Sequence, residues 1–486
     1  MMYSFYAIPV LLASAFIIAV VGIKKDSLTP YVAVSSTLAG LILVVMTFPE
    51  VLAKNVISMQ THGWPAPFGI TLVIDPLSMF MLLIATGIGF FTALVSFTHI
   101  DERKTEYYTL LCLIMVGVLG VIHTGDMFNL FVFVEIMSIS SYCLVAYYRN
   151  RTSIEGSIKY LIMSAMATSV MLLSIAMIYG TTGTLNMADL SFKLGEMGVL
   201  MPVIFGFLMT GLLFKSAVVP FHVWKPDAVM AAPASMAALF VTASLTGVYV
   251  IFRMFFTVFV VTNMFIYNMI TVMAVVTMLL GAIMAMQQTN ILRLLAYGSI
   301  SQIGYIMLAF GIGAMHGFGF TAAVFHLINV AIFDSLLFFC AAVMIHDAKS
   351  SDMHEIGRKV RFSSALGYCF LIGILSSVGV PLLNGFASKW IIYIATLYVQ
   401  PLLTVVALMV SVLTLAYGMR AFYIMFLSNA DHSRKKRIPL PMFMPLAVLA
   451  GLCVLLGIYP QLGVDVSEFV TRNMVNMRYI LAVLGI

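Results

Sequence analysis

A lysine within an apolar run is the first feature of this 486-residue sequence that could do chemistry. In the stretch GLLFKSAVVPFHVWKPDAVMAAPA, residues 211–234, Lys215 stands shortly before Pro220. Proline lacks a backbone N–H and breaks or kinks a helix. A charge within a membrane span beside such a break is costly, and it is usually kept for ion movement or for a buried ion pair. The pattern therefore predicts a functional lysine in a broken membrane helix.

Glu135 supplies the complementary charge, within the run HTGDMFNLFVFVEIMSISSYCLVAYY. An ionised carboxylate inside a span is costly unless it is paired or becomes neutral. Close together, Glu135 and Lys215 favour each other's charged form, whereas apart the lysine can release its proton. The two residues predict a proton switch, and a static salt bridge between helices is the alternative.

Lys389 repeats this arrangement in SSVGVPLLNGFASKWIIYIA, where Pro381 and Gly385 interrupt the apolar run. Two broken spans in two parts of a chain are typical of inverted-repeat transporters, whose ion sites lie at the breaks. Lys215 precedes its proline and Lys389 follows its own, a reversal that suits two halves of opposite topology.

A third polar group lies between these spans, in AAVFHLINVAIFDSLLFFCAA. His326 and Asp334 are about two helical turns apart, on roughly one side of a helix, with Asn329 nearby. This placement favours a hydrated relay, although a lone histidine in a span is often only a packing residue. The span before it carries a polar face that could hold waters or bond to other helices, made of Tyr297, Ser299, Ser301, Gln302 and Tyr305.

The elements that must position these residues are membrane helices. The chain is 62% hydrophobic and 9% charged, with a mean hydropathy of +1.08, which is far outside the range of soluble proteins. Apolar runs of about 18–25 residues recur, without the alternation of a β-barrel. We expect an all-α polytopic membrane protein of about fourteen spans, near 4–23, 31–48, 75–97, 107–123, 127–148, 157–180, 200–219, 234–259, 264–286, 291–312, 318–345, 363–400 (broken at Pro381), 402–427 and 441–459.

The charges in the loops predict an orientation. With the N-terminus outside, most lysines and arginines fall in inner loops, as expected of a membrane protein. Lys225 is among the residues assigned to those loops. Arg253 and Arg420, near helix ends, are expected to reach the membrane interface in structural roles, and Asp75 is expected to cap a helix.

The sequence offers no sign of a cofactor. Its five cysteines form no CxxC pair and no metal-ligand spacing with histidine. No glycine-rich phosphate loop follows a strand, and the basic residues cluster in short loops, as a membrane protein requires, without indicating nucleic acid. We therefore expect no cofactor and no metal on this chain.

Four segments resemble motifs of the antiporter-like subunit family: FKSAVVPFHVWKPDAVMAAPASMAAL, MFNLFVFVEIMSISSYCLVAY, LRLLAYGSISQIGYIMLA and GVPLLNGFASKW. This family comprises the large proton-pumping membrane subunits of respiratory complex I, the D-type and A-type subunits of Mrp sodium/proton antiporters, and relatives in membrane-bound hydrogenases and sulfur-reducing complexes. The resemblance covers roughly residues 70–430.

The resemblance implies fourteen core helices, two inverted five-helix repeats and a chain of lysines and a glutamate across the membrane. Glu135, Lys215 and Lys389 match its ion-pair and lysine positions. The implied division is an N-terminal three-helix segment (1–106), a first repeat broken at Pro220 (107–260), a second repeat broken at Pro381 (261–428), and a C-terminal helix and tail (429–486).

Two positions depart from the family pattern. Thr246 stands where the family usually has a lysine, in the span after the first break. Where many members read HxxxHxxxK, this chain has His326, Val330 and Asp334. The central part of the relay is therefore altered.

These observations predict an ion-translocating subunit that moves protons, or exchanges Na⁺ for H⁺, through Glu135, Lys215, His326, Asp334 and Lys389. Its expected place is a prokaryotic cell membrane, with other membrane subunits of an Mrp-type or complex I-like assembly as partners. Energy would come from a redox module on a partner or from an existing ion gradient. One alternative is a non-pumping scaffold, because Thr246 and Asp334 replace relay lysines; another is a self-sufficient transporter of a small solute.

Overall fold

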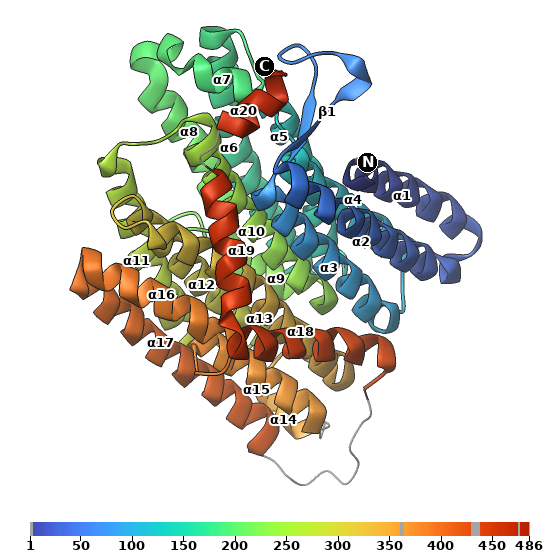
Figure 1. The fold of residues 1–486 in the computed structure, drawn as a ribbon. Helices are drawn as coiled ribbons and strands as arrows, with labels where there is room; N and C mark the ends of the chain where they lie inside the picture. The colour runs from blue at the N-terminus through green and yellow to red at the C-terminus, as the bar shows by residue number, and fades with distance from the viewer. Residues whose placement is uncertain (1–2, 360–363, 429–437, 475–476, 486) are drawn as a thin grey trace.

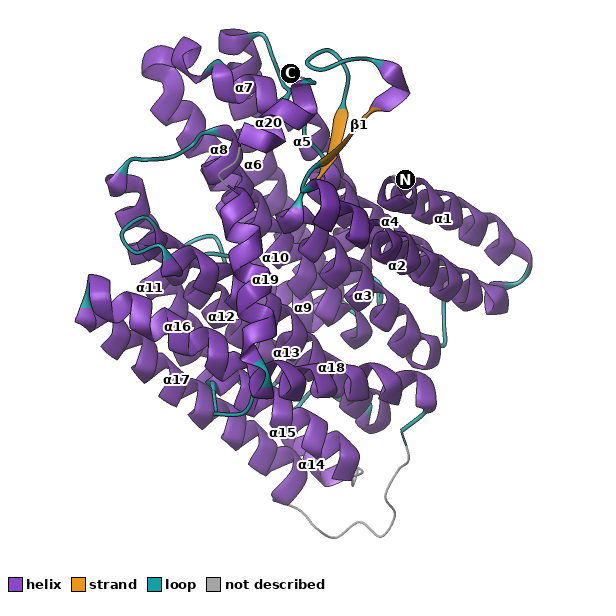
Figure 2. Cartoon of the chain, viewed as in Figure 1, coloured by secondary structure: helices purple, strands orange, loops and turns teal. Residues whose placement is uncertain are grey.

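The computed structural model describes residues 3–359, 364–428, 438–474 and 477–485, and these residues are almost entirely helical (Figure 2). The helices are α1 (Ala7–Lys24), α2 (Thr29–Lys54), α3 (Pro76–His99), α4 (Lys104–His123), α5 (Met127–Val145), α6 (Arg151–Thr182), α7 (Met187–Phe192), α8 (Met201–Lys215), α9 (Trp224–Ala231), α10 (Ala237–Arg253), α11 (Met264–Met286), α12 (Ile291–Gly313), α13 (Phe318–Ala348), α14 (Met353–Lys359), α15 (Ser364–Val378), α16 (Asn384–Val399), α17 (Pro401–Phe422), α18 (Leu440–Ile458), α19 (Pro460–Met474) and α20 (Met477–Leu484). The strands β1 (Ile57–Gln60) and β2 (Thr71–Ile74) form an antiparallel hairpin in which Ile57 pairs with Ile74.

The expected membrane spans are present. Within the described ranges, 13 helices are long and apolar enough to cross a membrane. The remaining expected span, 363–400, is divided into α15 and α16 by a non-helical segment at residues 379–383. The prediction of an all-α polytopic membrane fold is confirmed, with the break at Pro381. Its division into two inverted repeats stays a prediction.

The first break also lies where the sequence predicts it. Helix α8 ends at Lys215, and the chain passes through turns around Pro220 before α9 begins at Trp224. Ala217, just after the end of α8, has a φ of 54°, in the left-handed region that ends a right-handed helix. The next long span, α10, begins after a further short turn.

The centre of the molecule is formed by three helices, α10, α12 and α13. The apolar stretches of α10 and α12 are buried throughout, and most of α13 is buried as well. Peripheral helices such as α1, α2, α17 and α18 instead expose large apolar side chains, including Phe16 and Val20. A helix that is apolar on all sides belongs inside a bundle or against lipid. The polar residues on α12 and α13 therefore lie in the protein interior.

The two ends of the bundle differ. At one end, at the top of Figure 1, the β1–β2 hairpin, α7 and α20 lie together, and α14 lies at the opposite end. Helix α20 is an apolar segment that is too short to cross a membrane on its own. The Ser58 hydroxyl donates a hydrogen bond of 2.7 Å to the Ala482 carbonyl, which ties the hairpin to α20.

Helix α19 has no counterpart among the elements expected from the sequence, in which only a tail follows the last span. Its charged residues Asp465, Glu468 and Arg472 interrupt any apolar run. The helix packs along α13 and α3. A Cβ on Gly463 would lie 2.1 Å from the Phe325 ring, so this glycine permits the close approach of α19 to α13.

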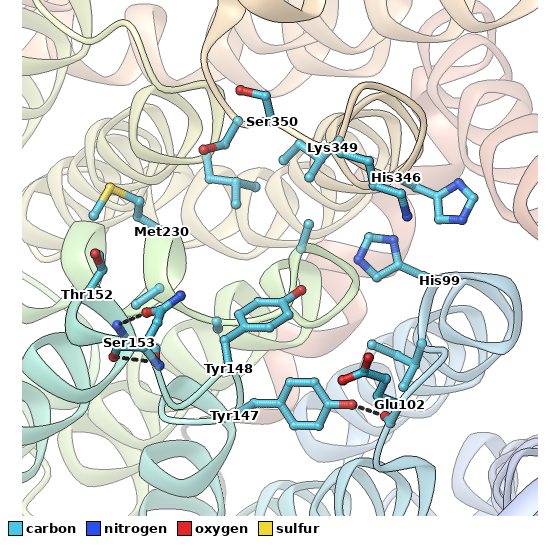
Figure 3. A pocket seen from close by; sticks show the side chains of 18 of the residues that line it. His99, Glu102, Tyr147, Tyr148, Thr152, Ser153, Met230, His346, Lys349 and Ser350 are labelled. Atoms are coloured by element: carbon cyan, nitrogen blue, oxygen red, sulfur yellow. Dashed lines mark hydrogen bonds between the residues drawn. The ribbon is translucent and has the colours of Figure 1, made fainter.

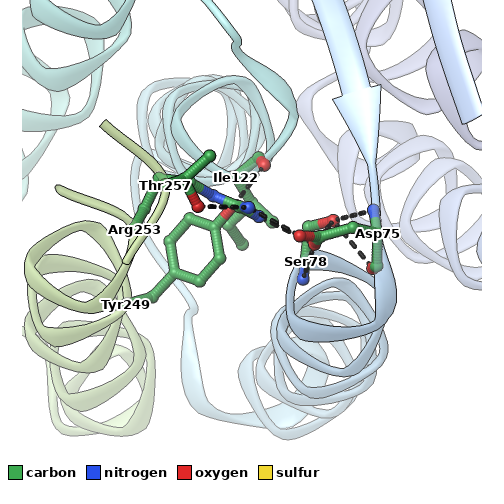
Figure 4. Close-up of polar contacts among 6 residues, drawn as sticks. All are labelled: Asp75, Ser78, Ile122, Tyr249, Arg253 and Thr257. Atoms are coloured by element: carbon green, nitrogen blue, oxygen red, sulfur yellow. Dashed lines mark hydrogen bonds and ion pairs between the residues drawn. The ribbon is translucent and has the colours of Figure 1, made fainter. Parts of the chain in front are cut away.

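A buried ion pair joins α3 and α10 (Figure 4). The Arg253 guanidinium donates to both carboxylate oxygens of Asp75, at 2.5 and 2.7 Å, and to the Tyr249 hydroxyl at 3.1 Å. Asp75 also caps α3 by accepting from the Ser78 backbone N–H, as predicted. Burial disfavours the Asp75 carboxylate, and the charge of Arg253 offsets this cost together with the hydrogen bonds from Arg253 and Ser78.

The expectation that Arg253 reaches the membrane interface is wrong. Its side chain is only 5% exposed, because Asp75 neutralises its charge inside the protein. Arg420 does lie at a helix end, where it donates to the carbonyls of Met286 and Gln288 at the end of α11. Both arginines have structural contacts.

Candidate ion pathway

Lys215 is buried at the end of α8, with 4% of its surface exposed. Its Nζ donates hydrogen bonds of 2.6 Å to the hydroxyls of Ser138, on α5, and Ser164, on α6. Lys215 is the last residue of α8, directly before the break. Two neutral hydroxyls thus hold the ammonium group.

Glu135 lies on α5, one turn before Ser138, and forms no ion pair with Lys215 in the described part of the structure. Its Oε1 is buried and has no hydrogen-bond partner among the described residues. Glu135 is nevertheless the acidic residue whose charge acts on Lys215. The two residues are therefore neighbours without the direct contact of a salt bridge, and the switch between them stays a prediction.

Lys389 is fully buried near the start of α16. Its Nζ donates to the Ser377 carbonyl at 2.7 Å, the Val378 carbonyl at 3.4 Å and the Ser411 hydroxyl at 3.3 Å. The two carbonyls belong to the last turn of α15, where unpaired C=O groups carry partial negative charge. Lys389 thus binds the helix end that the break creates, and the Tyr305 ring lies 4.1 Å from its Nζ.

His326 and Asp334, on α13, face this second lysine. His326 Nδ1 is 2.9 Å from the hydroxyl of Ser388, the residue before Lys389, whereas its Nε2 is buried without a partner among the described residues. Asp334 is 5% exposed, and its Oδ2 also lacks a described partner. The charge of Lys389 acts on both side chains. The structure therefore brings Lys389, His326 and Asp334 into one group.

A small cavity adjoins Asp334, Gln302 and Tyr417. It leaves about 10 Å³ for the centre of a water molecule, roughly the space that one water needs. Gln302 Oε1 is a second buried acceptor without a described partner, while Gln302 Nε2 donates to the Ser377 carbonyl at 3.2 Å. Of the polar face on α12, Gln302 thus lies at the site, whereas Ser301 bonds to the Met278 carbonyl of α11.

The assignment of Lys225 to an inner loop is wrong. The residue is fully buried in α9, and its Nζ has no hydrogen-bond partner among the described residues. A short polar stretch between two apolar spans is normally interpreted as a loop. After a helix break, however, such a stretch can fold back inside the bundle. Two signals could have revealed this lysine. It stands between Trp224 and Pro226, and the acidic Asp334 in an apolar span requires a basic partner.

Trp224 joins the two ends of the break. Its indole donates a 2.9 Å hydrogen bond to the carbonyl of Phe214, the residue before Lys215. Its ring stacks on Tyr160, with centroids 4.3 Å apart and an interplanar angle of 7°. Also in the first turn of α9, Asp227 pairs with Lys159 at 3.6 Å and Arg293 at 3.2 Å. These contacts fix α9 against α6 and α12.

Thr246 takes no part in these groups. Its hydroxyl donates to the Thr242 carbonyl, at 2.9 Å, within the same helix. The neighbouring Gly247 lets α10 approach the break, since a Cβ there would lie 2.9 Å from the Ser216 nitrogen and 3.1 Å from the Lys215 carbonyl carbon. At Thr246 and Gly247, α10 therefore packs closely against the break and provides no titratable side chain.

A cavity of about 740 Å³ opens among loops that the sequence assigns to the inner side (Figure 3). His99 and His346 lie on one side of it, with ring centroids 5.6 Å apart. His99 Nδ1 is buried without a described partner. Met230 and Ala231, at the end of α9, form another part of the wall. The cavity thus reaches the short helix that carries Lys225.

Comparisons with known proteins agree with this architecture. Residues 124–414 match the family described as "NADH:quinone oxidoreductase/Mrp antiporter, TM". The chain is 30% identical over 444 residues, 89% of each protein, to the D-type component of a Na(+)/H(+) antiporter of Alkalihalophilus pseudofirmus. It is 32% identical over 430 residues to subunit N of an NADH-quinone oxidoreductase of Desulforudis audaxviator. This match covers 82% of this chain and 84% of the relative.

A solved structure is similar over the whole length. A chain of the membrane-bound sulfane sulfur reductase, an archaeal respiratory membrane complex, superposes with a TM-score of 0.93 at 29% identity. The match covers 100% of both chains.

Proposed function

The chain belongs to the NADH:quinone oxidoreductase/Mrp antiporter family of transmembrane proteins, and on that premise we propose that it is an ion-translocating subunit of a multi-subunit membrane complex. The relatives named above are subunits of sodium/proton antiporters and of respiratory complexes. We place the protein in a prokaryotic cell membrane with its N-terminus outside, beside other membrane subunits. It carries protons, or exchanges Na⁺ for H⁺.

One observation carries this proposal: the buried lysines Lys215 and Lys389 are held by neutral oxygen atoms at helix breaks. Neither forms an ion pair within the described residues. A lysine that serves only structure would be expected to have a carboxylate partner, because an unpaired buried charge is costly. Hydroxyls and carbonyls stabilise the ammonium group while leaving it able to release its proton.

Charge movement at Glu135 would control the first lysine. When Glu135 approaches Lys215, the ammonium form is favoured; when it withdraws, the proton can leave. Lys389 would respond in the same way to Asp334, and a protonated His326 would have the opposite effect by repelling the ammonium group. A change in charge at one site is then passed to the next by electrostatic repulsion and attraction. The energy would come from a redox partner or from an ion gradient.

The test is Lys215→Ala in the assembled complex. In everted membrane vesicles, we expect proton translocation to be lost while the subunit still copurifies with its partners. Lys54→Ala is the matched control, since Lys54 is exposed and pairs with Glu50 on the surface. Normal translocation by the assembled Lys215→Ala complex would refute the proposed role.

A second function is a scaffold that holds neighbouring pumping subunits. The position of Thr246 favours it, because this side chain bonds only to its own helix where the family usually has a lysine. In that case Lys389→Ala would weaken the complex but leave translocation by the assembled fraction unchanged. Loss of translocation with normal assembly would argue against the scaffold.

A further inference from the structure

We infer that Lys225 and Asp334 form an additional proton-exchanging pair, which connects the group around Lys215 with the group around Lys389. This inference rests on the proposed function. Lys225 would donate a proton to Asp334 through a water molecule, and Asp334 would pass it to the neutral amine of Lys389. The ligand of this site is a proton.

Two buried and unsatisfied groups of opposite charge are the first support. Lys225 is fully buried, Asp334 is 5% exposed, and both Lys225 Nζ and Asp334 Oδ2 lack a hydrogen-bond partner among the described residues. An isolated charge at such a depth is costly. Each group therefore needs either an opposite charge nearby or a way to become neutral.

The packing at the start of α12 brings the two residues near each other. Asp227, two residues after Lys225, pairs with Arg293 at 3.2 Å, and Leu294 and Leu295, next to Arg293, line the same cavity as Asp334. Asp334 is the acid whose charge acts on Lys225, and Lys225 and Lys389 are the cations that act on Asp334. Helix α9 contacts α12, and α12 contacts α13, which carries Asp334. Asp334 thus stands in the field of one lysine from each broken span.

The cavity beside Asp334 supplies space for a proton carrier. Asp334 Oδ2 and Gln302 Oε1 are both buried acceptors without described partners, and both residues line this cavity. One water would satisfy both by donating a hydrogen bond to each. The same water keeps a lone pair that can accept a proton from an ammonium group.

The exchange removes the cost of burying charge. An N–H bond of the Lys225 ammonium breaks and an O–H bond forms on Asp334, so a charged pair becomes a neutral amine and a carboxylic acid. No electrons leave the pair. The acid then gives its proton to the Lys389 amine, which becomes an ammonium group, and Asp334 returns to its charged form. The cycle closes when Lys389 releases this proton onward and returns to the neutral amine, and Lys225 takes up a new proton.

The large cavity ends at the helix that carries Lys225. Met230 lies in its wall, five residues after Lys225 on α9, which is about 7.5 Å along a helix. The cavity also holds the His99–His346 pair (Figure 3). Protons from the inner side would therefore reach the end of the helix that carries the first member of the pair.

The test compares Lys225→Arg with the double variant Lys225→Met/Asp334→Asn in everted vesicles containing the assembled complex. Arginine keeps the positive charge but does not release its proton. The double variant removes both charges at once, so it leaves no unpaired charge behind. We expect both variants to assemble and both to lose proton translocation.

A static ion pair gives the opposite results. Lys225→Arg would then preserve translocation, and an assembled double variant with wild-type translocation would overturn the inference. A double variant that fails to assemble, together with an active Lys225→Arg complex, would also overturn it.

Lys215→Ala, measured in parallel, separates this inference from the proposed function. If Lys215→Ala abolishes translocation and the Lys225 variants do not, only the pair is refuted. If Lys215→Ala remains active, the proposed function itself fails.

Discussion

Single side chains decide how each buried lysine of this protein is stabilised. Lys215 relies on Ser138 and Ser164, and Lys389 relies on the last carbonyls of α15. A neutral acceptor stabilises an ammonium group less than a carboxylate does, so both forms of the lysine stay accessible. The serines are therefore as much part of the site as the lysine.

We expect the double variant Ser138→Ala/Ser164→Ala to slow translocation while leaving the complex assembled. A hydrogen bond to a charged group contributes about 1.5–3 kcal/mol, so losing both would cost about a hundred-fold or more in rate. Initial rates in everted vesicles measure the effect. Ser191→Ala is the control, because, among the described residues, the Ser191 hydroxyl bonds only to the Ala188 carbonyl within α7. A wild-type rate in the double variant would contradict the role of the serines.

The buried pair of Asp75 and Arg253 has a structural role, and its removal should affect stability. Arg253→Leu leaves Asp75 charged and unpaired, which is expected to cost about 3–5 kcal/mol. The double variant Asp75→Leu/Arg253→Leu should lose less, because no charge is left behind. Thermal denaturation of the purified complex would show the order; equal losses in the two variants would contradict it.

Sequence reasoning found Glu135, Lys215, His326, Asp334 and Lys389 because a charge in an apolar run is conspicuous. It missed Lys225, because this residue lies in a polar stretch, where a lysine is expected to belong to a solvent-exposed loop. It also could not show that Lys389 binds helix-end carbonyls, because those contacts arise only when α15 and α16 are brought together. Whether these six residues conduct ions stays a prediction.

At the scale of elements, the two broken helices position the chemistry. Pro220 and Pro381 mark both breaks in the sequence, and the structure has them there. Proline is a local signal, so it can be read without the fold. Helix α19 carries no comparable signal, because charged residues interrupt it and its packing against α13 depends on residues far away in the chain.

Gly385 is expected to be essential for the second break. A Cβ at this position would lie 1.7 Å from the Ser376 carbonyl oxygen, so alanine must push the start of α16 away from the end of α15. We expect Gly385→Ala to reduce translocation strongly by displacing Lys389 from the Ser377 carbonyl. The control is Gly206→Ala, where nothing lies within 4 Å; equal activity of the two variants would contradict this account.

At the scale of the whole molecule, the proposed orientation can be tested directly. Asp101 and Glu196 are exposed in loops that the sequence places on opposite sides of the membrane. In a Cys143→Ser background, we expect Glu196→Cys to react with a membrane-impermeant maleimide in intact cells. Asp101→Cys should react only in everted vesicles. The reverse pattern would place the N-terminus inside.

Trp224 gives the protein an optical reporter of its own. The sequence contains only three tryptophans, and this one precedes Lys225, bonds to the residue before Lys215 and stacks on Tyr160. Indole emission shifts with the electric field across the ring. Each time either amine gains or loses a charge, the fluorescence of this one residue should change, so turnover could be followed in real time without attaching a dye.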